Sequence, residues 1–237
     1  MASGVVYIGA NTRRGIAGET NPTIQGVVNI DATSGSMNKI DNLPAKNAFS
    51  PMYLGPFYYG NQYIEVFENF WQYGKIFPEL GHLDEEGNVT EKWREFRRKG
   101  WIKKRGDRHP DGTRTNDVKF VDDKGRNRYR YMIASSSSYD VKGKKQLNYI
   151  DSRKFVYCYV YSELVKRQPA FQALRRKVEA GESFQILDLD GPRKERTLKV
   201  TLEMLREKIN DPSEPFGHGY VLAGMLAGID PKEYCDY

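Results

Sequence analysis

Three polar side chains interrupt an otherwise apolar and aromatic stretch at residues 63–75, YIEVFENFWQYGK. Glu68, Gln72 and Lys75 are spaced four and three residues apart, so on a helix they lie within about 60° of one another. A carboxylate can stabilise positive charge or activate water, an amide can orient a ligand, and an ammonium can neutralise a phosphate. The spacing therefore predicts a helix with one chemically useful polar side.

An ordinary surface helix has a similar pattern. Phe67, Phe70 and Tyr73 fall on the opposite arc, which would face the core and leave the polar side in water. Two features favour a site instead: the polar side is narrow, and Trp71 flanks it, although solvated faces seldom carry tryptophan.

A basic tract follows at residues 92–108, KWREFRRKGWIKKRGDR. Nine Lys or Arg against two acids give it a local excess of +7, compared with a formal net charge of +6 for the whole chain. Trp93, Phe96 and Trp101 are interleaved with the cations. The mixture suits phosphate contacts with stacking on bases, and it also suits a solvated helix whose tryptophans pack inward.

Composition limits the class of protein. The 237 residues are 39% hydrophobic and 29% charged, with no apolar run near the roughly 18 residues of a membrane span. Cys158 and Cys235 are too few for a disulfide framework or a thiolate metal site. No His, Cys or carboxylate cluster has metal-ligand spacing, and no glycine-rich phosphate loop is present. We expect a cytoplasmic protein with no membrane partner, no metal and no cofactor.

The elements that must position these residues follow in order along the chain. Residues 1–47 read as strands and loops that pack on a domain formed by 48–237, with a polar excursion at 109–149 that includes a hairpin. A helix over 63–77 should be central, Thr90 should cap another, and Pro169 should open one ending at Gly181. The strand SFQILDLDG at 183–191 ends on acid. We expect an α+β fold: one compact, mainly helical domain with a small sheet.

The segment SPMYLGPFYYGNQYIEVFENFWQYGK at 50–75 resembles the signature of the NADAR family, which has the YbiA-like fold. The matching positions are Ser50, Tyr53, Pro56, Phe57, Tyr63, Glu68, Trp71, Gln72 and Lys75. The helical stretch at 152–181, the strand FQILDLDG and the segment GHGYVLAGMLAG at 217–228 resemble later elements of that family. The likeness spans about residues 48–229.

The resemblance implies an N-glycosidase that cleaves an ADP-ribosyl or ribosyl-phosphate N-glycosidic bond. The favoured reaction is removal of ADP-ribose from guanine in nucleic acid or nucleotide. Glu68 would stabilise positive charge on the ribose and activate water, while Lys75, Lys103 or Lys104 could instead attack a ring-opened ribose as a Schiff base. The partner would be an ADP-ribose-like nucleotide or ADP-ribosylated nucleic acid. The residues expected to bind it are Ser50, Tyr53, Phe57, Tyr63, Trp71, Gln72, Arg105, Arg108, Asp190 and His218.

Departures from the family pattern surround this expected pocket. Pro51 follows Ser50 where the family has Asn, and Gly191-Pro192 follow Asp190 where it has Trp-Gly. A family Gly-x-Asn is replaced by Gly217-His218-Gly219, whose histidine also reads as an ordinary loop residue. Two alternatives therefore stay open: a non-catalytic ADP-ribose or nucleotide-binding module, and a glycosidase for another modified nucleobase in DNA.

Smaller expectations concern single residues. Asp188 and Asp190 either supply a second carboxylate at the pocket or are simply the end of a strand that caps the next turn. His82 and His109 are expected at the surface. The oligomeric state is not predicted.

Overall fold

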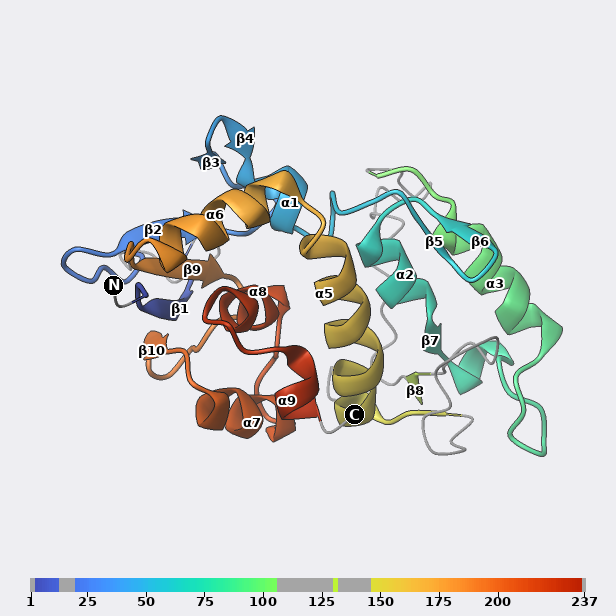
Figure 1. Ribbon diagram of the computed structural model, residues 1–237. Helices are drawn as coiled ribbons and strands as arrows, with labels where there is room; N and C mark the ends of the chain where they lie inside the picture. The colour runs from blue at the N-terminus through green and yellow to red at the C-terminus, as the bar shows by residue number, and fades with distance from the viewer. Residues whose placement is uncertain (1–2, 13–19, 106–129, 132–145, 236–237) are drawn as a thin grey trace. The chain divides into compact units, whose positions relative to one another are not determined.

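The computed structural model describes residues 3–12, 20–105, 130–131 and 146–235 (Figure 1). Most of the expected excursion at 109–149, together with Arg108 and His109, lies outside these ranges. The chain divides into two compact units. Unit 1 consists of Met1–Leu54 and Arg153–Tyr237, and unit 2 of Gly55–Ser152. The boundary expected at residue 48 does not coincide with this division.

A four-stranded mixed sheet organises unit 1 (Figure 1). Its order is β10-β1-β9-β2, formed by β1 (Val6–Ala10), β2 (Val28–Asp31), β9 (Phe184–Asp188) and β10 (Thr197–Lys199). Strand β9 is parallel to β1 and β2, whereas β10 is antiparallel to β1. All five residues of β9 are buried, as expected for a central parallel strand covered on both faces. The segment 1–47 therefore supplies two strands to the sheet itself.

The helices of unit 1 are α1 (Ala45–Phe49), the π-helix η2 (Arg153–Cys158), α5 (Tyr159–Val165), α6 (Pro169–Glu179), α7 (Leu202–Asn210), α8 (His218–Leu226) and α9 (Pro231–Cys235). Helices α1 and α8 contact the sheet of unit 1, and other helices of the unit pack around them. Helix α8 lies against β1 and β9, and it is buried almost all round because it is apolar on every side. Helix α6 has Pro169 in its first turn and is followed by Gly181 at φ 101°, which confirms the predicted start and stop.

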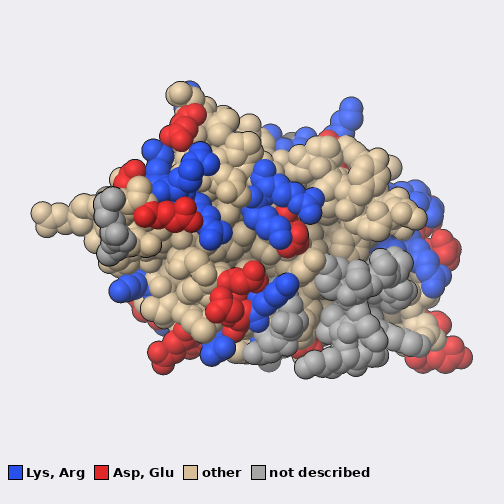
Figure 2. Space-filling view, in the orientation of Figure 1, with Lys and Arg blue, Asp and Glu red and all other residues tan. Residues whose placement is uncertain are grey.

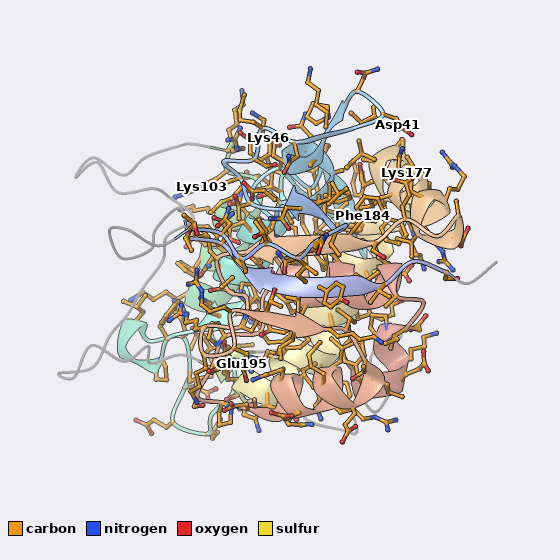
Figure 3. All side chains as sticks on the ribbon, turned by 90° about the vertical axis from the view of Figure 1, so that its left-hand side faces the viewer. Asp41, Lys46, Lys103, Lys177, Phe184 and Glu195 are labelled. Carbon is orange, nitrogen blue, oxygen red and sulfur yellow. The ribbon has the colours of Figure 1, made fainter. Side chains whose placement is uncertain are left out.

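A small hairpin in unit 1 packs against α6. Strands β3 (Lys39–Ile40) and β4 (Leu43–Pro44) are joined by Asp41 and Asn42, both of which have positive φ as a type I′ turn requires. Asp41 Oδ1 lies 3.3 Å from Lys177 Nζ of α6, and both side chains are visible together in Figure 3. Similar pairs explain why Lys and Arg are interspersed with Asp and Glu on the face of unit 1 in Figure 2.

Unit 2 combines a hairpin with short helices. Its elements are β5 (Phe57–Tyr59), β6 (Gln62–Ile64), α2 (Phe67–Tyr73), β7 (Lys75–Ile76), the 3-10 helix η1 (Pro78–Leu80), α3 (Glu91–Trp101), β8 (Arg130–Tyr131) and α4 (Tyr149–Ser152). Thr90 Oγ1 accepts a hydrogen bond from the Trp93 amide, which confirms the predicted cap of α3.

The helix expected over 63–77 is shorter than predicted. Residues 62–64 form β6 with Phe57–Tyr59, and residues 75–76 form β7 with Arg130–Tyr131, so only 67–73 are helical. Strand pairing with partners elsewhere in the chain overrides the helical periodicity at both ends. The α+β class is confirmed, while the family-type fold stays a prediction. No helix in the described part of the chain has the length and apolar character that a membrane-crossing segment needs.

The two tryptophans of the basic tract belong to the core of unit 2. Trp93 and Trp101 are 1% and 3% exposed. Trp93 Nε1 donates to the Lys75 carbonyl at 3.0 Å, and Trp101 Nε1 donates to the Phe70 carbonyl at 3.3 Å. The interpretation that these rings stack on bases is wrong, and the alternative in which they pack inward is confirmed.

Candidate functional site

A hydrogen-bonded chain links the three polar residues of the opening stretch. Gln72 Nε2 donates to Glu68 Oε1 at 2.7 Å, and Lys75 Nζ donates to Gln72 Oε1 at 2.5 Å. An ammonium can only donate and a carboxylate can only accept, so the amide of Gln72 has one orientation that serves both. Gln72 thus couples the positive charge of Lys75 to the negative charge of Glu68.

Burial differs along this chain. Lys75 is 6% exposed, whereas Glu68, Gln72 and the neighbouring Trp71 are half-buried. A buried ammonium is costly unless it is hydrogen-bonded and compensated by negative charge. The Gln72 amide meets part of that need, and Glu68 lies at the less buried end of the chain. The arrangement therefore has a half-buried carboxylate at one end and a buried ammonium at the other.

Asn69 is a positioning residue that sequence reasoning missed. It is 1% exposed, and its Nδ2 donates to the Lys103 carbonyl at 2.6 Å. This bond fixes the segment after α3, which carries the predicted Lys104 and Arg105, to α2. Both of those cations are exposed. The available signal was an asparagine within the aromatic arc of α2, where an apolar residue is expected.

The predicted aromatic residues of unit 2 point in different directions. Phe57 packs edge-on against Phe70 with ring centroids 5.9 Å apart. Tyr63 is 38% exposed and pairs across the hairpin with Tyr58, which is 72% exposed; their ring centroids are 5.8 Å apart. The Tyr63 hydroxyl donates to Glu65 Oε2, and this bond raises the pKa of Tyr63. The hairpin therefore displays two tyrosine rings to solvent.

Ser50 and Tyr53 belong to unit 1, whereas the rest of the matching motif belongs to unit 2. Ser50 is 1% exposed, ends α1 and accepts a hydrogen bond on Oγ from the Met52 amide. Tyr53 is half-buried, with Lys46 Nζ 5.8 Å from its ring centroid.

A second cluster lies at the carboxyl end of β9 in unit 1. Asp188 is 1% exposed; its Oδ2 accepts the Gly219 amide at 2.8 Å and lies 3.3 Å from His218 Nδ1. His218 Nε2 lies 3.0 Å from the Ala32 carbonyl, so both ring nitrogens face acceptors. His218 is the first residue of α8 and is 9% exposed, so the interpretation of an ordinary loop histidine is wrong.

The glycines on each side of His218 have a steric reason. A Cβ on Gly217 would lie 2.6 Å from Asp188 Oδ2 and 2.6 Å from Asp190 Cβ, and one on Gly219 would lie 2.5 Å from Asp188 Cβ. No side chain fits at such distances, so the Gly-His-Gly sequence lets the start of α8 rest directly on the two carboxylates.

Asp190 is the accessible member of this cluster, because 51% of its side chain is exposed. Partial burial and the neighbouring Asp188 raise the pKa of Asp190, against the lowering effect of His218 and two arginines. Tyr161 supports the cluster from α5. Its hydroxyl donates to the Phe49 carbonyl at 2.6 Å and its ring meets that of His218 edge-on. Tyr161 carried no sequence signal beyond its place in an aromatic helix.

His82 is buried rather than at the surface as expected. It is 1% exposed, its Nδ1 accepts the Phe77 amide at 3.2 Å, and its ring lies 4.8 Å from that of Phe96. Burial and the charge of Lys92 lower the pKa of His82 to about 4. Its hydrogen bond requires an unprotonated Nδ1, so His82 is a structural residue of unit 2.

Comparisons of the chain with protein-family models, curated proteins and solved structures found no match. Within the described ranges, no three His, Cys, Asp or Glu side chains are arranged to hold a metal ion. The geometry of the two clusters is therefore the basis on which a function can be proposed.

Proposed function

We propose that the protein is an N-glycosidase that hydrolyses the bond between ADP-ribose and guanine in nucleic acid or nucleotide. The observation that carries the proposal is the Glu68–Gln72–Lys75 chain, which holds a half-buried carboxylate and a buried ammonium on one short helix and the strand that follows. The sequence resemblance supplies the substrate class, and the chain supplies groups suited to it.

The chemistry follows from charge. When the ribosyl C1–N bond breaks, its electron pair leaves with the base and positive charge develops on the sugar. The Glu68 carboxylate stabilises that charge and takes a proton from the water whose oxygen bonds to C1, while the departing nitrogen gains a proton. Gln72 holds Glu68 in place through its 2.7 Å hydrogen bond.

Lys75 fits a role in charge compensation better than one in covalent catalysis. An amine that attacks a ring-opened aldehyde needs a free electron pair, whereas Lys75 donates to Gln72 at 2.5 Å. We assign Lys75 to fixing Gln72 and to offsetting the negative charge of Glu68 from its buried position. Lys103 and Lys104, which follow α3, are the other candidate amines for a Schiff base.

A nucleic-acid substrate is favoured over a free nucleotide by the surface of unit 2. The exposed rings of Tyr58 and Tyr63 lie on the β5–β6 hairpin. Glu65, the first residue after this hairpin, donates its amide to the Trp101 carbonyl at 2.9 Å, and the cationic residues 103–105 lie shortly after Trp101 in the chain. Exposed aromatic rings beside cations suit stacked bases and phosphates of a single strand.

The alternative is a binding module without turnover, and unit 1 offers an observation in its favour. Asp190 lies just beyond the carboxyl end of the parallel strand β9, where open sheets bind ligands, and a carboxylate there can accept ribose hydroxyls.

One experiment distinguishes the hydrolase from the binding module. The protein is incubated with an ADP-ribosylated guanine oligonucleotide, and the release of ADP-ribose is measured. A hydrolase should lose about 10²–10⁴-fold in kcat on Glu68→Gln while KM changes little. The control is Glu85→Gln, which alters an exposed carboxylate of the same unit outside the chain. Absence of turnover with retained binding would favour the module, and full turnover by Glu68→Gln would refute the proposed role of Glu68.

A further inference from the structure

A pocket of about 250 Å³ lies within unit 1, apart from every residue considered so far as a functional group. It is formed by α5 and the residue that follows it, by α6, and by the turn between α8 and α9. Its volume is below the roughly 300–1,000 Å³ of pockets that enclose drug-sized ligands, so it suits a smaller molecule.

The pocket has an apolar part. Tyr159, Met225, Ile229 and Pro231 contribute ring, thioether and aliphatic surface to its lining. Tyr159, Met225 and Ile229 are half-buried and Pro231 is buried, so this surface is held by the packing of unit 1. A compact apolar body can displace water from such surface on binding.

Three cations also line the pocket: Lys166, Arg175 and Lys232. The side chains of Lys166 and Arg175 are 46% and 48% exposed, so a ligand can reach them. Each comes from a different segment of the chain, and their convergence is a product of the fold rather than of a local charge run.

The two acids in the lining are engaged with their own neighbours. Glu163 pairs with Lys166 and, at 3.7 Å, with Arg167, while Asp230 Oδ1 accepts the Lys232 amide at 2.9 Å. Arg175 meets Glu179 through its Nε at 3.0 Å, and its guanidinium carries four further N–H groups in a planar fork. The donors of the lining therefore exceed the acceptors, which favours an anionic ligand.

We propose that this pocket binds a small molecule that carries one oxyanion group, a carboxylate or a phosphate monoester, on a compact apolar body. Arg175 and Lys232 hold the oxyanion, and the apolar surface around Ile229 covers the body. The site shares no residue with the proposed glycosidase function and stands or falls independently of it.

The test is calorimetric or NMR titration of the full chain with phenyl phosphate and benzoate, which distinguish the two oxyanion sources. Inorganic phosphate lacks the apolar body, and benzyl alcohol lacks the charge. We expect saturable 1:1 binding of phenyl phosphate or benzoate, at least about tenfold tighter than either incomplete probe. Arg175→Gln and Lys232→Gln should each weaken binding by about tenfold.

The matched control is Arg176→Gln, which removes the same charge from the same helix at a neighbouring exposed position that does not line the pocket. Its affinity should stay within about twofold of the wild type. Equal losses in Arg175→Gln and Arg176→Gln would reduce the effect to general surface charge and overturn the proposal. So would absence of saturable binding, or binding of inorganic phosphate or benzyl alcohol as tight as that of the complete probes. Melting temperatures confirm that each variant is folded.

Discussion

At the scale of single residues, Gln72 is an uncharged member of the candidate site, and its substitution tests how the two charged members are held together. Its amide joins two opposite charges, through bonds of 2.7 and 2.5 Å. Replacing it with Met keeps the volume and removes both bonds. Because Lys75 is 6% exposed, loss of this acceptor should lower the free energy of unfolding by about 1–3 kcal/mol.

Urea denaturation of Gln72→Met measures that loss. Gln62→Met is the control, because Gln62 is exposed on β6 and should change stability by less than about 0.5 kcal/mol. Equal stability of Gln72→Met and the wild type would mean that the amide does not support the buried ammonium.

His82 provides a residue-scale prediction about pH. Its pKa is lowered to about 4 in the folded protein, from an ordinary value of 6.5. Between these values the unfolded chain binds the proton and the folded chain does not, so stability is complete above about pH 6.5 and is lost as pH falls toward 4. The shift corresponds to a loss of up to about 3 kcal/mol.

His82→Gln isolates this effect, because the glutamine amide oxygen can accept the Phe77 amide without titrating. The difference in unfolding free energy between the wild type and the variant should narrow or change sign as the pH falls from 7 to about 4.5. A difference that does not vary with pH would contradict the assignment. Other titrating groups are common to both proteins and cancel.

At the scale of elements, the start of α8 is fixed by contact with Asp188. Gly219→Ala would place a Cβ 2.5 Å from Asp188 Cβ, and the backbone of α8 or β9 would have to move. We expect a loss of about 1–3 kcal/mol, although alanine favours helix. Gly224→Ala in the same helix is the control, because the nearest contact of its Cβ would be the end of the Leu205 side chain at 3.0 Å, and its next contacts would be at 3.8 and 3.9 Å. Thermal denaturation that ranks the two alike would contradict this account.

Elements with local signals could be predicted from the sequence, and those with distant partners could not. Thr90 caps α3 and Pro169 opens α6 because capping and proline geometry act within one turn. Strand β6 pairs with the adjacent Phe57–Tyr59 in a local hairpin, and there the helical periodicity was extended too far toward the N-terminus. Strand β7 was predicted as helix because its partner, Arg130–Tyr131, is known only from the fold. The same limit applies to the site. Glu68 and Gln72 share one turn of helix, whereas Asp188 and His218 meet only when α8 packs on β9.

At the scale of the whole molecule, the net charge of +6 is smaller than the +7 excess of the tract at 92–108, so the rest of the chain is close to neutral or acidic. Ion pairs such as Arg94–Glu91 and Lys99–Glu95 use part of that charge on α3. The half-buried Lys103 and the exposed Lys104 and Arg105 continue it beside the hairpin that displays Tyr58 and Tyr63. An excess concentrated in one segment predicts that a polyanion binds unit 2 by a local surface, not by the charge of the whole protein.

The last prediction separates the two contributions to this binding. Charge releases counterions from a nucleic acid and so determines the salt dependence, whereas ring stacking does not. Arg105→Glu should weaken binding of a single-stranded oligonucleotide. It should also reduce the slope of the logarithm of the binding constant against the logarithm of salt concentration. Tyr58→Ala should weaken binding by about 1–3 kcal/mol at every salt concentration and leave the slope unchanged.

Met37→Ala, which removes an 80% exposed apolar side chain from unit 1, is the control and should change neither the affinity nor the slope. Fluorescence anisotropy at several salt concentrations measures both. If Tyr58→Ala binds as the wild type does while Arg105→Glu does not, the tyrosine pair has no contact with bases and the tract acts through its charge alone.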